Sequence, residues 1–149
     1  PNGCMICEAE VDPATGQISV DRLYAIDDVG AMVNPLTLEG QLHGSIAQGL
    51  GEALMEQILY DPESGQLLTG SFMDYGVPRA EMMPDIISGV SLVPSTNNLL
   101  GVKGGSEAGN CGMPSAIIHA VLDALSPLGV TDVPIPATPE RVWQAIQNA

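Results

Sequence analysis

Two apolar-rich segments near the N-terminus have the pattern of β-strands. Ile6 to Val11 and Gln17 to Asp27 are separated by Asp12-Pro13-Ala14-Thr15-Gly16. In that connection the proline presets one turn dihedral and the glycine supplies a positive φ. The pattern therefore predicts a β-hairpin.

The longest periodic segment follows Asn34-Pro35, a pair that can start a helix. Its apolar residues recur at every fourth position and are Leu38, Leu42, Ile46, Leu50, Leu54 and Ile58. This spacing predicts a helix that continues through Ile58.

Small residues form a stripe along one face of the same predicted helix, at Gly40, Gly44, Ala47 and Gly51. Each glycine inside a helix costs up to ~1 kcal/mol relative to alanine, so the stripe needs a compensating close approach of another element or of a ligand. Gln48 lies beside it. Its amide would suit a flat polar ligand, whereas tight packing against a strand would leave Gln48 as a surface amide, and both interpretations stay open.

Shorter elements are predicted in the second half of the chain. Residues 66–80 have the pattern of a strand and loop, and Ile86 to Val93 that of a further strand before the polar loop Pro94 to Asn98. Pro114 is a natural first residue of a helix that Ser126-Pro127-Leu128-Gly129 ends. Its apolar face consists of Ile117, Ile118, Val121, Leu122 and Leu125.

A final helix is predicted after Thr138-Pro139-Glu140. The threonine is an N-cap, the proline fits the first helical position and the acid is favourable at the positive end of the helix. Val142, Trp143 and Ile146 form the side expected to be buried.

Composition limits the fold to one compact domain. The chain has 149 residues with 45% apolar and only 3% aromatic side chains, and it contains 17 glycines and 12 prolines. The core must therefore be built from aliphatic residues and methionine, with many turns between short elements. An irregular α/β or α+β body fits best.

Charge narrows the classes of partner. Eighteen acids oppose Arg22, Arg79, Lys103 and Arg141, which gives a net charge of −14. Such a field disfavours nucleic acids and anionic membrane surfaces. No run of about 18 apolar residues and no signal peptide is evident, so we expect a cytoplasmic protein. The chain opens without Met, so this absence says little about a longer parent.

The cysteines and histidines give no strong metal signal. Cys4 and Cys7 have the C-x-x-C spacing, but no second pair completes a tetrahedral zinc site, and Cys111 leaves an odd thiol. We interpret Cys4 and Cys7 as ordinary strand residues. His119 falls on the polar side of its helix and is expected in solvent, while His43 is expected to be packed or hydrogen-bonded.

The segment GVKGGSEAGNCG, residues 101–112, combines five glycines with Glu107 and the only lysine, Lys103. A glycine-rich loop before a helix exposes backbone N–H groups that can bind an anion. The spacing matches neither the phosphate-loop pattern nor the dinucleotide fingerprint. Glu107 is either a general base or an acid that stabilises the next helix through its dipole, and spacing alone leaves both open.

A set of motifs in a fixed order resembles the C-terminal molybdopterin-binding part of the xanthine dehydrogenase/aldehyde oxidase family, especially large subunits of the carbon monoxide dehydrogenase type. The resemblance spans almost the whole chain and implies an α+β fold, with mixed sheets and packed helices, for residues 1–149 as the C-terminal portion of a cofactor-binding domain. The motifs are Glu8 to Pro13, Asn34-Pro35-Leu36, Glu39 to Gly44, Ala47 to Gly51, Gly70 to Tyr75, Lys103-Gly104, Glu107-Ala108-Gly109 and Thr138 to Trp143.

The resemblance implies hydroxylation of an aldehyde or an aromatic N-heterocycle at a molybdenum carried by molybdopterin, with water as the oxygen source. Glu107 would be the general base and Gln48 a cofactor contact. The cofactor would be lined by Lys103, Gly104, Gly105 and Ser106. Implied partners are the remainder of the large subunit, iron–sulfur and FAD subunits, and a second copy in a homo-oligomer. The sequence does not distinguish the plain pterin from its cytosine dinucleotide form.

Three features keep other interpretations open. Ser106 stands where the family usually has glycine, family large subunits are several times longer, and Cys111 does not correspond to the active-site cysteine of the carbon monoxide branch. The isolated chain is therefore expected to have little or no turnover. One alternative is a non-catalytic assembly domain of the same fold without metal. Another alternative is a small module that binds phosphate ligands through the amides of the glycine loop.

Overall fold

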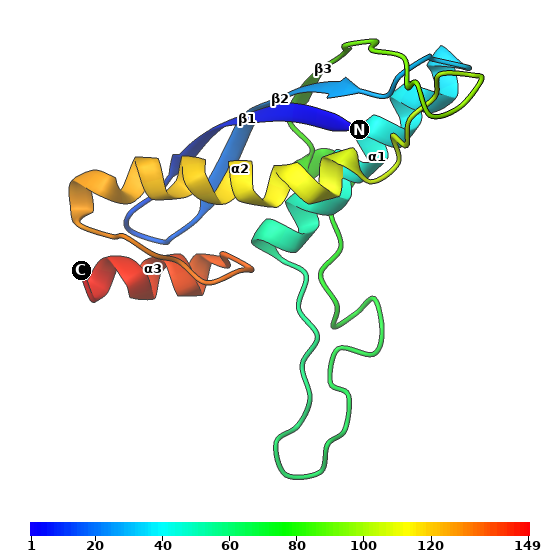
Figure 1. Cartoon of the computed structure of the whole chain (residues 1–149). Helices are drawn as coiled ribbons and strands as arrows, with labels where there is room; N and C mark the ends of the chain where they lie inside the picture. The colour runs from blue at the N-terminus through cyan, green and yellow to red at the C-terminus, as the bar shows by residue number, and fades with distance from the viewer.

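The computed structural model describes residues 1–149 and has an α+β architecture (Figure 1). The sheet has the order β1-β2-β3, with β1 (Asn2–Val11) antiparallel to β2 (Ile18–Asp28) and β2 parallel to β3 (Asp85–Val90). The helices are α1 (Pro35–Leu54), α2 (Ala108–Leu125) and α3 (Pro139–Gln147), with short 3₁₀ turns η1 (Ala80–Met82) and η2 (Ser126–Leu128). The expected fold class is confirmed.

The predicted hairpin forms between β1 and β2. Gly16 has a φ of +72°, and the Asp12 carboxylate accepts hydrogen bonds from the Ala14 amide and the Thr15 hydroxyl. A Cβ at Gly16 would lie 2.1 Å from the Pro139 carbonyl oxygen. The hairpin turn therefore packs directly on the backbone at the start of α3.

The core lies between the sheet and the helices, and α2 runs along the sheet while crossing α1 (Figure 1). On β2, alternate residues Leu23, Ala25 and Asp27 are all buried, because side chains two apart in a strand share one face. The main contributors from the helices are Ile46, Leu50, Met113, Ile117, Val121, Leu125 and Val142.

Helix α1 begins as predicted. The Asn34 side chain accepts from the Thr37 amide, and Pro35 occupies the first turn. It ends at Leu54, so the extension to Ile58 is wrong. The Gly51 carbonyl accepts from the amides of both Met55 and Glu56, which closes the last turn, and Ile58 is 63% exposed.

An arm of residues 55–79 follows α1 and projects from the body (Figure 1). Its only strand-like pairing is the isolated bridge between Tyr60 and Leu67, so the predicted strand within residues 66–80 is wrong. The apolar residues there lack a partner strand; Phe72 and Met73 are exposed. The next strand is confirmed as β3, but it spans 85–90 instead of 86–93, because the Val93 amide turns to the Asp28 carboxylate.

Helix α2 begins at Ala108, so the predicted start at Pro114 is wrong. Five of the twelve residues of the glycine-rich segment are helical, because its glycines permit a close helix crossing. A Cβ on Gly109 would lie 2.3 Å from Ser45 Oγ and 2.4 Å from the Ile46 nitrogen, and one on Gly49 would lie 2.9 Å from Met113 Cβ. Pro114 lies inside the helix and packs its ring near Gly49.

The glycine stripe of α1 has two different environments. A Cβ on Gly51 would lie 2.7 Å from Pro78, so that glycine permits a close approach of the arm. Gly40 and Gly44 have nothing within 4 Å of the position of a Cβ, so neither approaches another element of this chain.

The C-terminal elements begin and end close to the predicted residues. Helix α2 ends at Leu125, η2 follows, and Gly129 has a φ of +84°. Thr138 accepts from the Arg141 amide at 3.4 Å and begins α3. Val142 is buried and Ile146 half-buried, but Trp143 is 42% exposed, so its predicted burial is wrong. Neighbouring residues lie about 100° apart around a helix, and Val142 takes the inward direction.

By length and composition, residues 108–128 could cross a membrane. In the fold, however, the apolar residues of α2 pack against α1 and the sheet. One face of α2, which includes Met113, Ile117 and Val121, is therefore buried in the fold.

Replacement of Gly109 tests the helix crossing. We expect Gly109→Ala to lower the free energy of unfolding by about 2 kcal/mol or more, because backbone atoms of α1 block the new methyl group. Gly44→Ala is the matched control and should stabilise by about 0.5–1 kcal/mol, since its site in α1 is open. Urea unfolding of the 149-residue chain measures both. Equal effects of the two substitutions would contradict the close crossing.

Candidate functional site

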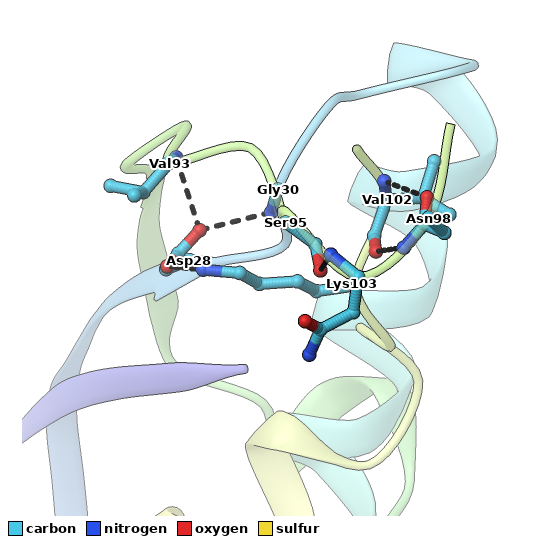
Figure 2. A network of polar contacts seen from close by, with 8 residues as sticks. Asp28, Gly30, Val93, Ser95, Asn98, Val102 and Lys103 are labelled. Atoms are coloured by element: carbon cyan, nitrogen blue, oxygen red, sulfur yellow. Dashed lines mark hydrogen bonds and ion pairs between the residues drawn. The ribbon is translucent and has the colours of Figure 1, made fainter. Parts of the chain in front are cut away.

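The glycine-rich stretch of residues 101–112, which we call the glycine segment, is anchored by an ion pair. This pair joins Lys103 to Asp28, the last residue of β2 (Figure 2). The buried Asp28 carboxylate also accepts from the amides of Gly30 at 2.9 Å and Val93 at 3.2 Å. The Lys103 ammonium, followed by these amides, lowers the pKa of Asp28 to about 2. One carboxylate thus joins the chain after β2, the chain after β3 and the glycine segment.

Backbone contacts fix the same junction. The Ala31 amide donates to the Gly101 carbonyl at 2.8 Å, and the Lys103 amide donates to the Val29 carbonyl at 2.9 Å. Gly30 and Gly101 both have a φ of +67°, and a Cβ on Gly30 would lie 2.3 Å from the Gly101 oxygen. Both positions therefore require glycine.

Glu107 is the N-cap residue of α2, and its carboxylate makes no capping hydrogen bond. Lys103 lies four positions earlier, but its ammonium is paired with Asp28 instead. The Glu107 side chain is exposed. The positive end of α2 and a free carboxylate therefore coincide, an arrangement compatible with both interpretations of Glu107.

A pocket of about 570 Å³ lies beside Glu107, and we call it the Glu107 pocket. It is formed by the start of β1, Asp27, part of the glycine segment and one side of α2. Its lining residues are Pro1, Asn2, Gly3, Met5, Asp27, Gly104, Ser106, Glu107, Ala108, Cys111, Gly112, Ser115, Ala116 and His119.

A smaller pocket of about 280 Å³, the Lys103 pocket, lies between the glycine segment and the start of α1. Lys103 and Gly105 border this pocket, Gly104 borders the Glu107 pocket, and Ser106 borders both. The four residues expected to line a cofactor therefore form the partition between two neighbouring cavities.

Gln48 lies outside both pockets. Its amide is exposed on α1 and donates to Glu52 at 3.4 Å. The next residue, Gly49, contacts Gly109, two positions after Glu107. Gln48 and Glu107 therefore both lie next to the crossing of α1 and α2. Neither the Glu107 pocket nor the Lys103 pocket is lined by both residues.

The histidines and cysteines have separate environments. His43 lies 3.1 Å from the Ser88 hydroxyl and joins α1 to β3, which confirms its hydrogen-bonded role. His119 is exposed, as expected, at the edge of the Glu107 pocket. Cys4 and Cys7 are three residues apart on β1 and point to opposite faces. All three thiols are free, and burial, with a contribution from Glu8, raises the pKa of Cys7 to about 11.

Sequence reasoning missed Asp27 and Asp28. Asp27 is 2% exposed, its Oδ2 has no hydrogen-bond partner, and burial raises its pKa. The signal was present, because Asp27 continues the buried row of Leu23 and Ala25. A pair of acids at the end of an apolar strand, with a glycine two positions after the second acid, could have indicated both buried carboxylates.

Residues 1–84 match the sequence profile of the molybdopterin cofactor-binding domain. The chain belongs to this family. The match covers the hairpin, α1 and the arm.

Relatives extend the similarity of this molybdopterin cofactor-binding domain to the glycine segment. The nicotine 6-hydroxylase large subunit of Paenarthrobacter nicotinovorans is 41% identical over 147 residues, 99% of this chain and 18% of the relative. The carbon monoxide dehydrogenase large chain of Hydrogenophaga pseudoflava is 36% identical over 148 residues, which are again 99% of this chain and 18% of the relative.

A crystal structure of Cu,Mo carbon monoxide dehydrogenase in the reduced state superposes with a TM-score of 0.92 at 32% identity, over 98% of this chain and 18% of that chain. The resemblance to large subunits of the xanthine dehydrogenase family is therefore confirmed. The chain spans about a fifth of the length of these relatives.

Acid unfolding tests the Asp28 anchor. Because its folded-state pKa is lowered, Asp28 contributes stability that is fully present above its ordinary value of 3.8 and is lost as the pH falls through about 2. We expect Lys103→Met to lower the thermal midpoint at pH 7, and its difference from the wild type to shrink between pH 4 and pH 2. A difference independent of pH would contradict the ion pair.

Asp27 should have the opposite dependence. Its folded-state pKa is raised, so its favourable contribution is present below the ordinary value of 3.8 and is lost as the pH rises through the folded value. Asp27→Asn should therefore gain stability relative to the wild type as the pH rises from 3.5 to 7. Thermal unfolding measures this trend, and Asp21→Asn, an exposed acid on the same strand, should show none.

Proposed function

We propose that residues 1–149 are part of the large subunit of a cytoplasmic molybdenum hydroxylase, with Glu107 as its general base. The supporting observation is the free Glu107 carboxylate at the N-terminus of α2, beside a pocket of about 570 Å³. Membership of the molybdopterin cofactor-binding family and similarity to hydroxylase and dehydrogenase large subunits support the reaction class.

The residues of this chain fit a large planar cofactor. Gly40, Gly44 and Gly104 present backbone with nothing within 4 Å of a Cβ position, and Asp27 offers a buried carboxylate oxygen without a partner. Gln48, Lys103, Gly104, Gly105 and Ser106 are the proposed contacts. Lys103 would contribute backbone groups, because its ammonium is held by Asp28.

When bound, the molybdenum cofactor would supply a two-electron oxidation with water as the source of oxygen. Glu107 would accept, at its carboxylate, the proton that leaves the oxygen nucleophile. Because the carboxylate caps no backbone amide of α2, its oxygens are available for this transfer. The Asp28 anchor would keep the segment from Lys103 to Glu107 in place during the reaction.

Aldehydes or aromatic N-heterocycles are the proposed substrates, and one relative is a nicotine hydroxylase. Electrons would leave through iron–sulfur clusters to FAD on partner subunits, within a homo-oligomeric assembly. The second candidate is an assembly domain of the same fold without metal. It is favoured by Ser106, which places a hydroxyl and a Cβ at the boundary of both pockets.

Replacement of the proposed base is the decisive test. In the full-length large subunit with its partners, we expect Glu107→Gln to reduce turnover by about 10²–10⁴-fold while the molybdenum content stays unchanged. Glu10→Gln, an exposed acid of β1, is the control and should retain activity. Near-normal turnover of Glu107→Gln would refute the assigned role. Absence of molybdenum from the purified wild type would favour the assembly role.

A further inference from the structure

Asp27 occupies a position where the fold otherwise places apolar side chains. Leu23 and Ala25 precede it on the same buried face of β2, and its own exposure is 2%. Its Oδ2 atom has no hydrogen-bond partner. Because an isolated carboxylate away from water is costly, a hydrogen-bond donor is missing from this site.

Space for the Asp27 carboxylate is provided by glycine. Gly3 pairs with Asp27 across the hairpin, and a Cβ there would lie 2.3 Å from Asp27 Oδ1. On the facing helix α2, a Cβ at Gly112 would lie 2.8 Å from the sulfur of Met5. All four residues line the Glu107 pocket, so the carboxylate belongs to its wall.

The four basic side chains of the chain are all occupied elsewhere. Lys103 pairs with Asp28, Arg22 lies 3.9 Å from Glu8, Arg79 lies 3.7 Å from Glu81, and Arg141 donates to the Pro136 carbonyl at 3.0 Å. None of them reaches Asp27. None of the four cations of this chain is therefore the donor for Asp27, and a molecule bound in the Glu107 pocket can supply it.

We propose that the Glu107 pocket binds a flat heterocycle that presents adjacent N–H groups, and that Asp27 accepts hydrogen bonds from them. This inference rests on the proposed function and adds a residue that orients the bound ring. Two parallel N–H groups match the two oxygens of a carboxylate, and such charge-assisted pairs are the strong ones. The pocket volume of about 570 Å³ falls in the range of small-molecule sites.

Two sources share this chemistry, since the N–H edge belongs either to the amino-pyrimidinone ring of the pterin or to a substrate heterocycle. In both cases Asp27 fixes one end of the ring, and Glu107 lies in the wall of the same cavity. The competing source of the donor is an arginine or lysine from another part of the subunit, which would pair with the Asp27 carboxylate and leave no acceptor for the ring.

The test uses the full-length large subunit prepared without cofactor, titrated calorimetrically with 2-aminopyrimidin-4-one and with unsubstituted pyrimidine. We expect the first probe to bind at least tenfold more tightly, because only it has adjacent N–H donors. Asp27→Asn should lose at least tenfold in affinity for it. Asp21→Asn, an exposed acid of β2, is the matched control and should bind like the wild type.

Folding is checked separately by thermal unfolding. Asp27→Leu continues the apolar row of β2, so it should unfold at or above the wild-type temperature and yet bind no probe. Equal binding of 2-aminopyrimidin-4-one by the wild type and by Asp27→Asn, or no binding by the folded wild type, would overturn the proposal.

A repeat with the cofactor-loaded subunit distinguishes the two sources. If the pterin supplies the donor, the loaded protein should not bind the probe, and Asp27→Asn should be purified with less pterin. If the substrate supplies it, the loaded protein should still bind, and Asp27→Asn should raise KM for N–H-bearing heterocycles but not for aldehydes. Normal turnover of Glu107→Gln together with Asp27-dependent binding would overturn only the assigned general base.

Discussion

The ion pair between Asp28 and Lys103 is the constraint on which the arrangement of the site depends. Burial of a carboxylate at the end of β2 is tolerated because the Gly30 and Val93 amides and the Lys103 ammonium all donate to it. The chain has a single lysine among 18 acids, and this lysine lies where three connections meet. The ion pair therefore fixes the part of the glycine segment that precedes α2.

The glycines of residues 101–112 have mostly structural roles. Gly101 has a positive φ, Gly105 lies against Val29 and Leu38, and Gly109 and Gly112 permit close packing of α2 on α1 and β1. Gly104 alone has open space at its Cβ position, and it borders the Glu107 pocket. Within this segment, the absence of a side chain at Gly104 is therefore the feature best explained by a ligand.

Local signals in the sequence were sufficient for the hairpin, for the Asn34 and Thr138 caps and for the end of α2, because each depends on residues a few positions apart. The start of α2 was wrong because the crossing of Gly49 and Gly109 involves residues 60 positions apart and permits a helix through a glycine-rich stretch. The strand in residues 66–80 was wrong because its apolar residues find no partner strand. Trp143 was assigned to the core although Val142 already takes the inward direction.

The site was predicted only in part. The glycine segment and Glu107 were identified from composition and from family motifs, and the structure brings Gly104, Ser106 and Glu107 to one pocket. Asp27 and Asp28 were missed because acidic residues at a strand end are ordinarily exposed. The buried row of Leu23 and Ala25 could have indicated Asp27, but the pairing with Gly3 and Lys103 involves residues far apart in the sequence. Gln48 is exposed on α1 and lines neither pocket, so its proposed role as a cofactor contact requires a cofactor that extends from α1 to the glycine segment.

Amide hydrogen exchange tests the Asp28 anchor most directly. In Lys103→Met at pH 7, we predict faster exchange at the amides of Gly30, Val93 and residue 103, while the amides of the central hairpin pairs keep their wild-type protection. Unchanged protection at Gly30, Val93 and residue 103 would show that the glycine segment holds its position without the ion pair, which would contradict the role assigned to that pair.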